Sequence, residues 1–173
     1  MTLFQRIFQR PEPREALIPL YTAVMAEARQ PDWYLSGEVP DTLDGRFDMV
    51  ALVLALVLYR LEQLGIPGGA PAALLTELFV ADMDGQLREM GIDYSVGKQI
   101  GKMMQALGGR LTAYRDVREP KNIDALKAAL ERNLYRGAPP SEAALIFAAQ
   151  RVHTTDAQIR GLALEALLKG RLA

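Results

Sequence analysis

An unbroken apolar stretch from Met49 to Tyr59 is the feature that most restricts how this chain can fold. Its residues would cover nearly every side of a helix, so other elements must surround it. The stretch is far shorter than the roughly 18 to 20 residues that a helix needs to cross a bilayer. We therefore predict a buried central helix over about residues 42–64, capped by Asp41 or Thr42 and ended by Gly65 and Pro67.

Helical spacing of apolar residues predicts the elements that enclose this central helix. On the N-terminal side and after it, we expect a helix over 19–29, a loop over 31–40, a helix over 71–91, and a long helix from Asp93 or Ser95 to Tyr114. Beyond Pro120 we expect helices over 122–135, 140–153 and 155–169, the last opened by a capping box of Thr155 and Gln158. Gly97 and Gly101 lie one turn apart and would allow another backbone to approach closely.

The composition assigns the chain to the all-α class, as a single compact multi-helix bundle. Its 173 residues fit one domain by the usual prior of about 100 to 200 residues per domain. Half of the residues are hydrophobic and only 7% are aromatic, which favours packing of helix on helix. There is no cysteine and one histidine, His153, which we place at a helix end; we expect no metal and no cofactor. The formal net charge of −1 gives no general attraction to nucleic acid.

The first 13 residues differ from the rest of the chain. Leu3, Phe4, Ile7 and Phe8 recur at helical spacing among arginines and glutamines, and prolines at 11 and 13 end the pattern. We interpret residues 1–13 as a cationic amphipathic segment whose apolar stripe binds weakly to an anionic membrane. We interpret residues 14–173 as one helical domain. The absence of a signal-peptide pattern favours a cytoplasmic location, with a peripheral contact at the inner face of the cytoplasmic membrane.

Two blocks that mix charge with glycine, 39–48 and 82–91, interrupt otherwise apolar helical sequence. A half-buried charge without a partner is costly, so these charges must find one another. We predict an inter-helix clamp in which Arg46 binds Asp82, Asp84 or Glu89 and Arg88 binds Asp44 or Asp48. The clamp comprises Asp41, Asp44, Arg46, Asp48, Asp82, Asp84, Arg88 and Glu89. The spacing of Asp84 and Arg88 also supports an ion pair within one helix.

These blocks belong to a longer ordered pattern. It comprises Ala28 to Pro31, Tyr34, Val39 to Asp48, Asp82 to Asp84, Leu87 to Gly91, Val96 and Lys98. In this order and spacing, over about residues 20–114, the chain resembles the ubiquinol-cytochrome c chaperone family of bacterial proteins and mitochondrial assembly factors for the cytochrome bc1 complex (complex III). We expect the helices over 121–170 to pack on this part. Val53 and Leu107-Gly108-Gly109-Arg110 depart from the family's usual residues.

The resemblance implies a chaperone for assembly of ubiquinol-cytochrome c reductase that has no enzymatic activity. It implies cytochrome b or another bc1 subunit as the partner, with the ribosome surface as a further contact. The chain has no Walker motif, so such a chaperone would work without ATP.

Two features of the predicted third and fourth helices are candidates for partner binding. One is a basic helix face formed by Lys98, Lys102 and, further along, Arg110. This face either contacts an anionic surface, which would be a ribosome or a membrane, or is simply solvated. No aromatic residues interleave with these bases, so no specific nucleic-acid sequence is expected as a partner. The other feature is a group of methionines, Met83, Met90, Met103 and Met104. Their flexible thioether side chains either fill an irregular core or accept varied apolar clients.

Two other functions stay open at this point. One is a general α-helical adaptor for protein–protein contacts, without a role in bc1 assembly. The other is an enzyme that acts through Asp82, Asp84 and Glu89. Carboxylates alone, without a nearby histidine, cysteine or phosphate-binding loop, are a weak signal of catalysis, so the enzyme has the poorest support.

Overall fold

The computed structural model describes residues 14–89, 91, 96–115, 117 and 122–173, and all regular elements within these ranges are helical. They are the 3-10 turn η1 (Glu15–Leu17) and the helices α2 (Ile18–Ala28), α3 (Pro31–Leu35), α4 (Leu43–Gln63), α5 (Ile66–Glu89), α6 (Val96–Arg115), α7 (Ile123–Asn133), α8 (Glu142–Gly161) and α9 (Leu164–Leu168). The all-α prediction is confirmed. Residues 1–13 lie outside the described ranges, so the membrane-facing stripe of Leu3, Phe4, Ile7 and Phe8 stays a prediction.

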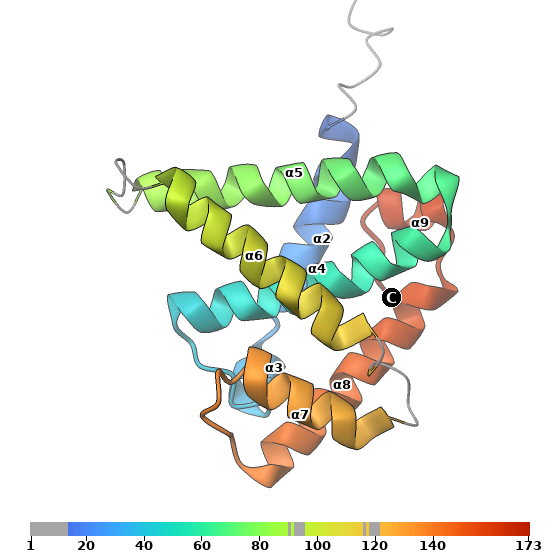
Figure 1. The fold of residues 1–173 in the computed structure, drawn as a ribbon. Helices are drawn as coiled ribbons and strands as arrows, with labels where there is room; N and C mark the ends of the chain where they lie inside the picture. The colour runs from blue at the N-terminus through green and yellow to red at the C-terminus, as the bar shows by residue number, and fades with distance from the viewer. Residues whose placement is uncertain (1–13, 90, 92–95, 116, 118–121) are drawn as a thin grey trace, which may run out of the picture.

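Helix α4 is the centre of the bundle, as the apolar stretch predicts (Figure 1). The Thr42 hydroxyl accepts a hydrogen bond from the Gly45 N–H at 3.1 Å and caps its start. Every residue from Asp48 to Val57 is buried, because α2, α5, α6 and α8 all pack against this helix. No helix among the described residues is long and apolar enough to cross a membrane.

The chain runs back and forth around α4. Figure 1 shows α5 leaving the C-terminal end of α4 and running back over it, with α6 returning at an angle from the far end of α5. Helices α7 and α8 pack against each other, and they contact α6 and α4 respectively. The start of α4 lies among α2, α5, α6 and the segment after α7.

Helix α5 begins at Ile66, five residues before the predicted start at Pro71. A Cβ atom on Gly68 would lie 1.9 Å from the Leu61 carbonyl oxygen, so only glycine lets this first turn lie against the end of α4. Pro71 lies inside the helix and removes one backbone donor, without ending it.

Four other local predictions are wrong. The predicted loop over 31–40 contains α3, because Pro31 is preset for a first helical turn and Trp33 is buried with its indole N–H donating to the Glu27 carbonyl at 3.1 Å. Thr155 is buried in the middle of an unbroken α8 and does not cap a helix, and His153 lies inside that helix as well. Among the residues that the structure describes, no atom outside the helix's own backbone lies within 4 Å of a Cβ atom built on Gly97 or Gly101, so no close approach of a described backbone occurs there.

Candidate functional site

The first two turns of α4 present different chemistry on their two sides. One side faces α6 and the segment after α7, and carries a buried ion-pair network around Asp48. The other side faces α2, α5 and α6, and forms the wall of an apolar pocket. The network fixes the position of the pocket wall through Phe47, whose ring lies against Arg110.

Asp48 is fully buried, with 0% of its side chain exposed, and it is bound by two arginines. Arg110 of α6 donates to Asp48 Oδ1 and also to the Asn133 carbonyl at 3.2 Å. Arg136 donates from Nε to Asp48 Oδ2 at 2.6 Å, while its Nη1 lies 2.7 Å from Asp44 Oδ2. One carboxylate of α4 thereby joins α6 and the end of α7.

Arg136 reaches this position through an unusual backbone conformation. Its φ is 53°, in the left-handed region, which costs a non-glycine residue about 1 to 3 kcal/mol. The turn is held because Tyr135 is buried and its hydroxyl donates to the Gly37 carbonyl at 2.6 Å. Burial raises the pKa of Asp48 although both arginines oppose this, and the hydrogen bond that Arg136 donates to Asp48 raises the pKa of Arg136.

The predicted clamp between α4 and α5 is wrong in its pairing. Arg46 does not reach α5: its Nε donates to Asp41 at 2.6 Å, and both side chains are 61% exposed. Asp44 and Asp48 bind Arg136, and Asp48 also Arg110, in place of Arg88. The physical reason is the rotation of α4 about its axis. Asp48 points to α6, whereas Arg46 lies half a turn away, toward solvent and α2.

The carboxylates of α5 serve local contacts. Asp82 Oδ2 accepts hydrogen bonds from Tyr21 at 2.7 Å and Gln86 at 2.9 Å, and burial together with this contact raises the pKa of Tyr21. Asp84 binds Arg88 at 2.7 Å, which confirms the predicted pair within one helix. Glu89 is exposed. These contacts join α5 to α2 and stabilise α5 itself, and they assemble no catalytic arrangement.

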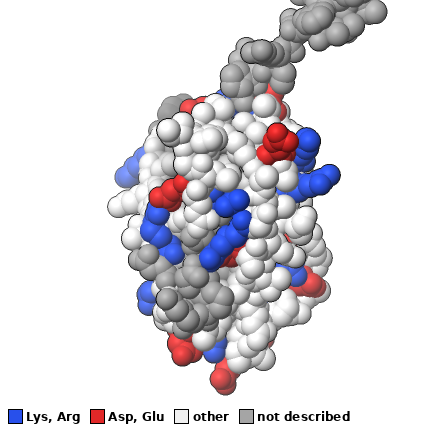
Figure 2. All heavy atoms as spheres, turned by 90° about the vertical axis from the view of Figure 1, so that its right-hand side faces the viewer, with Lys and Arg blue, Asp and Glu red and all other residues white. Residues whose placement is uncertain are grey.

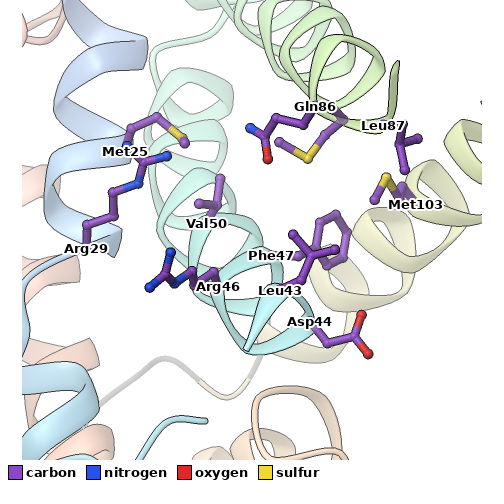
Figure 3. A pocket seen from close by; sticks show the side chains of 11 residues that line it. Met25, Arg29, Leu43, Asp44, Arg46, Phe47, Val50, Gln86, Leu87 and Met103 are labelled. Atoms are coloured by element: carbon purple, nitrogen blue, oxygen red, sulfur yellow. The ribbon is translucent and has the colours of Figure 1, made fainter. Parts of the chain in front are cut away.

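The pocket on the other side of α4 encloses about 140 Å³ between α2, α4, α5 and α6 (Figure 3). Its lining residues are Met25, Arg29, Leu43, Asp44, Arg46, Phe47, Val50, Met83, Gln86, Leu87 and Met103. Apolar side chains dominate, and three of them are methionines, each from a different helix. Unbranched thioether side chains can adapt their shape to what they contact, so this wall is suited to varied apolar ligands.

The charged residues of the pocket are at its rim and are separated. In Figure 3, Arg29 of α2 and Arg46 of α4 lie on one side of the opening, and Asp44 lies on the other, beyond Leu43. Phe47 connects the pocket to the network: its ring lies 5.6 Å from the Arg110 guanidinium carbon and 6.0 Å from the ring of Phe79. The buried ion pairs and Phe79 thus hold the aromatic wall of the pocket in place.

The predicted partner-binding residues separate into three groups. Met83 and Met103 line the pocket, while Met104 is half-buried against the core outside the lining, and Met90 is outside the described residues. Lys98 and Lys102 are exposed on α6 and do not line the pocket. Arg110 is only 11% exposed and belongs to the Asp48 network, so its assignment to a solvated basic face is wrong.

Sequence reasoning missed Met25, Arg29 and Arg136 as contributors to these two sites. Met25 and Arg29 are one turn apart at the end of α2, and that spacing is a usable signal for a shared face. Arg136 had no such signal, because its role depends on a left-handed turn that brings it back to α4.

Charged side chains of both signs are distributed over the face seen from the right-hand side of Figure 1. Figure 2 shows one face on which basic and acidic side chains are interspersed among uncharged surface. Within the described residues there is no group of three or more metal-ligating side chains placed to hold an ion. The pocket beside α4 is therefore the candidate functional site.

Comparisons with known proteins agree with this description. The family described as "Ubiquinol-cytochrome C chaperone" matches residues 36–173. A solved structure, described as the crystal structure of the Cbp3 homolog from Brucella abortus, is similar over 98% of this chain and 94% of that chain, with a TM-score of 0.81 and 29% sequence identity. None of the curated proteins that were compared matches the chain.

Proposed function

The chain belongs to the ubiquinol-cytochrome c chaperone family, and from this membership we propose that it assists assembly of the cytochrome bc1 complex by binding newly made cytochrome b. The observation that carries the proposal is the extent of the family match, which covers residues 36–173 and therefore the Asp48 network and every pocket residue except Met25 and Arg29. In this proposal the chain acts as a binding protein, without catalysis, ATP or a cofactor.

The Met-lined pocket supports the proposal as the place where a client would be held. A membrane protein exposes large apolar side chains before it is assembled, and a pocket with three methionines can accept more than one shape of side chain. The ion-pair network behind Phe47 supports the aromatic wall against which a client side chain would pack. We propose that the pocket holds one apolar side chain of the client.

Contacts with a ribosome or a membrane are a separate part of the proposal. Lys98 and Lys102 are exposed, and among the described residues neither has an ion-pair partner. They are therefore available to an anionic surface while the pocket holds the client. A location at the inner face of the cytoplasmic membrane would fit both contacts.

A deletion strain tests the proposal. Loss of the chain is expected to lower the amount of assembled bc1 complex and its b-type haem absorbance, and the wild-type chain should restore both. The Met103→Trp variant should fill the pocket and restore little bc1 complex. The Met104→Trp variant changes the adjacent residue, which is outside the lining, and should restore the complex well. Unfolding midpoints of both variants establish that they are folded.

Undiminished bc1 complex in the deletion strain would contradict the proposal. If an affinity-tagged chain then captured a soluble protein and no cytochrome b, a general adaptor would replace the chaperone as the conclusion. Equal restoration by the two tryptophan variants would leave the bc1 role standing and move the client contact away from the pocket.

A further inference from the structure

The pocket is one end of a longer groove. A second, more open hollow of about 380 Å³ shares Arg29 and Arg46 with the pocket and is lined further by Pro31, Tyr34, Leu35 and Asp41. We call the two hollows together the α2–α4 groove. Leu35 is 77% exposed, so the second hollow also offers apolar surface to a ligand. The two apolar surfaces are thus separated by Arg29 and Arg46, which line both hollows.

The charges along this groove are only partly compensated. Arg46 uses Nε for Asp41, and Asp44 is bound by Arg136. The Arg29 side chain has no hydrogen bond or ion pair to any other described residue, although it lines both hollows. Arg29 is the C-cap of α2, where the helix dipole stabilises its positive charge. The dipole does not supply a hydrogen-bond acceptor for the guanidinium group. Arg29 is therefore the uncompensated charge of the groove.

The size of the pocket limits what enters it. A cavity of about 150 Å³ lined by apolar side chains holds a molecule the size of benzene. The pocket, at about 140 Å³, therefore accepts one large apolar side chain such as phenylalanine or leucine. A lipid acyl chain would need a longer continuous apolar channel, but here charged residues separate the two hollows. A polypeptide, which alternates side chains of different character, fits this pattern.

We propose that the α2–α4 groove recognises a polypeptide segment in which a large apolar side chain lies beside a carboxylate. The apolar side chain enters the Met-lined pocket, the carboxylate binds Arg29, and a flanking apolar residue lies against Tyr34 and Leu35. A guanidinium suits this task because it binds a carboxylate through two parallel N–H donors. This inference rests on the proposed function and deepens it, since the segment would belong to the client.

A peptide-binding measurement tests the inference. The probe is a fluorescein-labelled amphipathic peptide of about 20 residues with Phe, Glu and Leu on one face, and the matched probe has Lys in place of that Glu. Fluorescence anisotropy with the full-length chain should show about tenfold tighter binding of the Glu probe, as expected for one charge-assisted contact. The difference should shrink as salt is raised, because the contact is at a solvent-exposed rim.

Two charge-reversal variants locate the contact. Arg29→Glu should reverse the preference between the two probes, and Arg132→Glu, an equal charge change at an exposed arginine of α7 outside the groove, should leave it intact. Arg29→Gln, which introduces no repulsion, should abolish the preference and guards against an effect of misfolding. Equal binding of both probes by the wild-type chain, or an unchanged preference in Arg29→Gln, would overturn the inference.

Anionic phospholipid vesicles distinguish a lipid from a peptide. The occupant is a lipid, and the inference is wrong, if three results are found together: the wild-type chain binds vesicles, Arg29→Gln weakens that binding, and neither peptide binds.

Failure of this inference can be distinguished from failure of the proposed function. Loss of peptide discrimination with bc1 assembly still dependent on the chain removes only the inference. Discrimination that persists in a chain without effect on bc1 assembly removes the proposed function and leaves a peptide-binding groove.

Discussion

Neighbouring residues in the first turns of α4 have opposite surroundings, and this contrast gives one helix a rigid side and an adaptable side. Asp48 is fully buried and meets Arg110 and Arg136 at fixed positions, whereas Phe47 and Val50 border a pocket whose other walls are flexible methionines. A buried charge tolerates only one arrangement of partners, since a misplaced partner leaves it uncompensated. An apolar pocket has no such requirement. The network side therefore fixes the helix, and the pocket side can adapt to a ligand.

The largest effect should come from breaking the network. Arg110→Met removes one of the two partners of a fully buried carboxylate, and we expect a loss of about 3 kcal/mol or more in the free energy of unfolding, measured by urea denaturation. Arg46→Met removes the partner of exposed Asp41, and its midpoint should stay where it is in the wild-type chain. Similar midpoints for the two variants would show that the network is no more important than a surface pair.

A second effect concerns the backbone at the start of α4. A Cβ atom on Gly45 would lie 2.0 Å from the Pro40 carbonyl oxygen, so Gly45→Ala should force a backbone shift and destabilise the fold by about 1 to 3 kcal/mol. Gly101→Ala on α6 meets no neighbour and should stabilise by about 0.5 to 1 kcal/mol through helix propensity. Thermal unfolding of both variants checks the opposite signs, and a stabilising Gly45→Ala would contradict the tight junction.

The smallest effect is a difference in pH dependence between two aspartates. Hydrogen bonding to Arg46 lowers the pKa of Asp41, so its ionised form stabilises the fold and this contribution is lost as pH falls through the folded pKa. Burial raises the pKa of Asp48, so protonation relieves a cost, and the contribution of Asp48 to stability increases as pH falls through its raised pKa to the ordinary value of an aspartate.

Asparagine variants separate these two contributions. The stability difference between the wild-type chain and Asp41→Asn should shrink on acidification from pH 6 to pH 3, while the difference from Asp48→Asn should shift in favour of the wild-type chain. Changes of the same sign in urea titrations across this range would show that the two sides of α4 are electrostatically alike.

Much of the fold follows from local pattern. The apolar stretch after Met49 predicts a central helix because its burial needs no knowledge of the neighbours, and Thr42 and Gly65 mark its ends by capping chemistry that acts within a few residues. The errors arise where a distant contact decides the outcome. Trp33 turns a predicted loop into α3 by packing into the core, and the contact of Gly68 with Leu61 allows α5 to begin early.

The candidate site was predictable in its residue types and not in its pairing. Met83 and Met103 were identified from their chemistry, and they do line the pocket. The partners of Asp48 come from 62 and 88 residues away in the sequence, so no local spacing could reveal them. Whether a charge on a helix faces a neighbour or solvent depends on a rotation that the sequence alone does not specify.

The central claim is that cytochrome b contacts the pocket side of α4, and site-specific photo-crosslinking tests it most directly. A photoreactive phenylalanine analogue replaces Met25, in the pocket, or Lys98, exposed on α6, in cells that synthesise labelled cytochrome b. The account predicts cytochrome b adducts from position 25 and few or none from position 98. Adducts from position 98 with none from position 25 would contradict it, as would the absence of cytochrome b from the products of both.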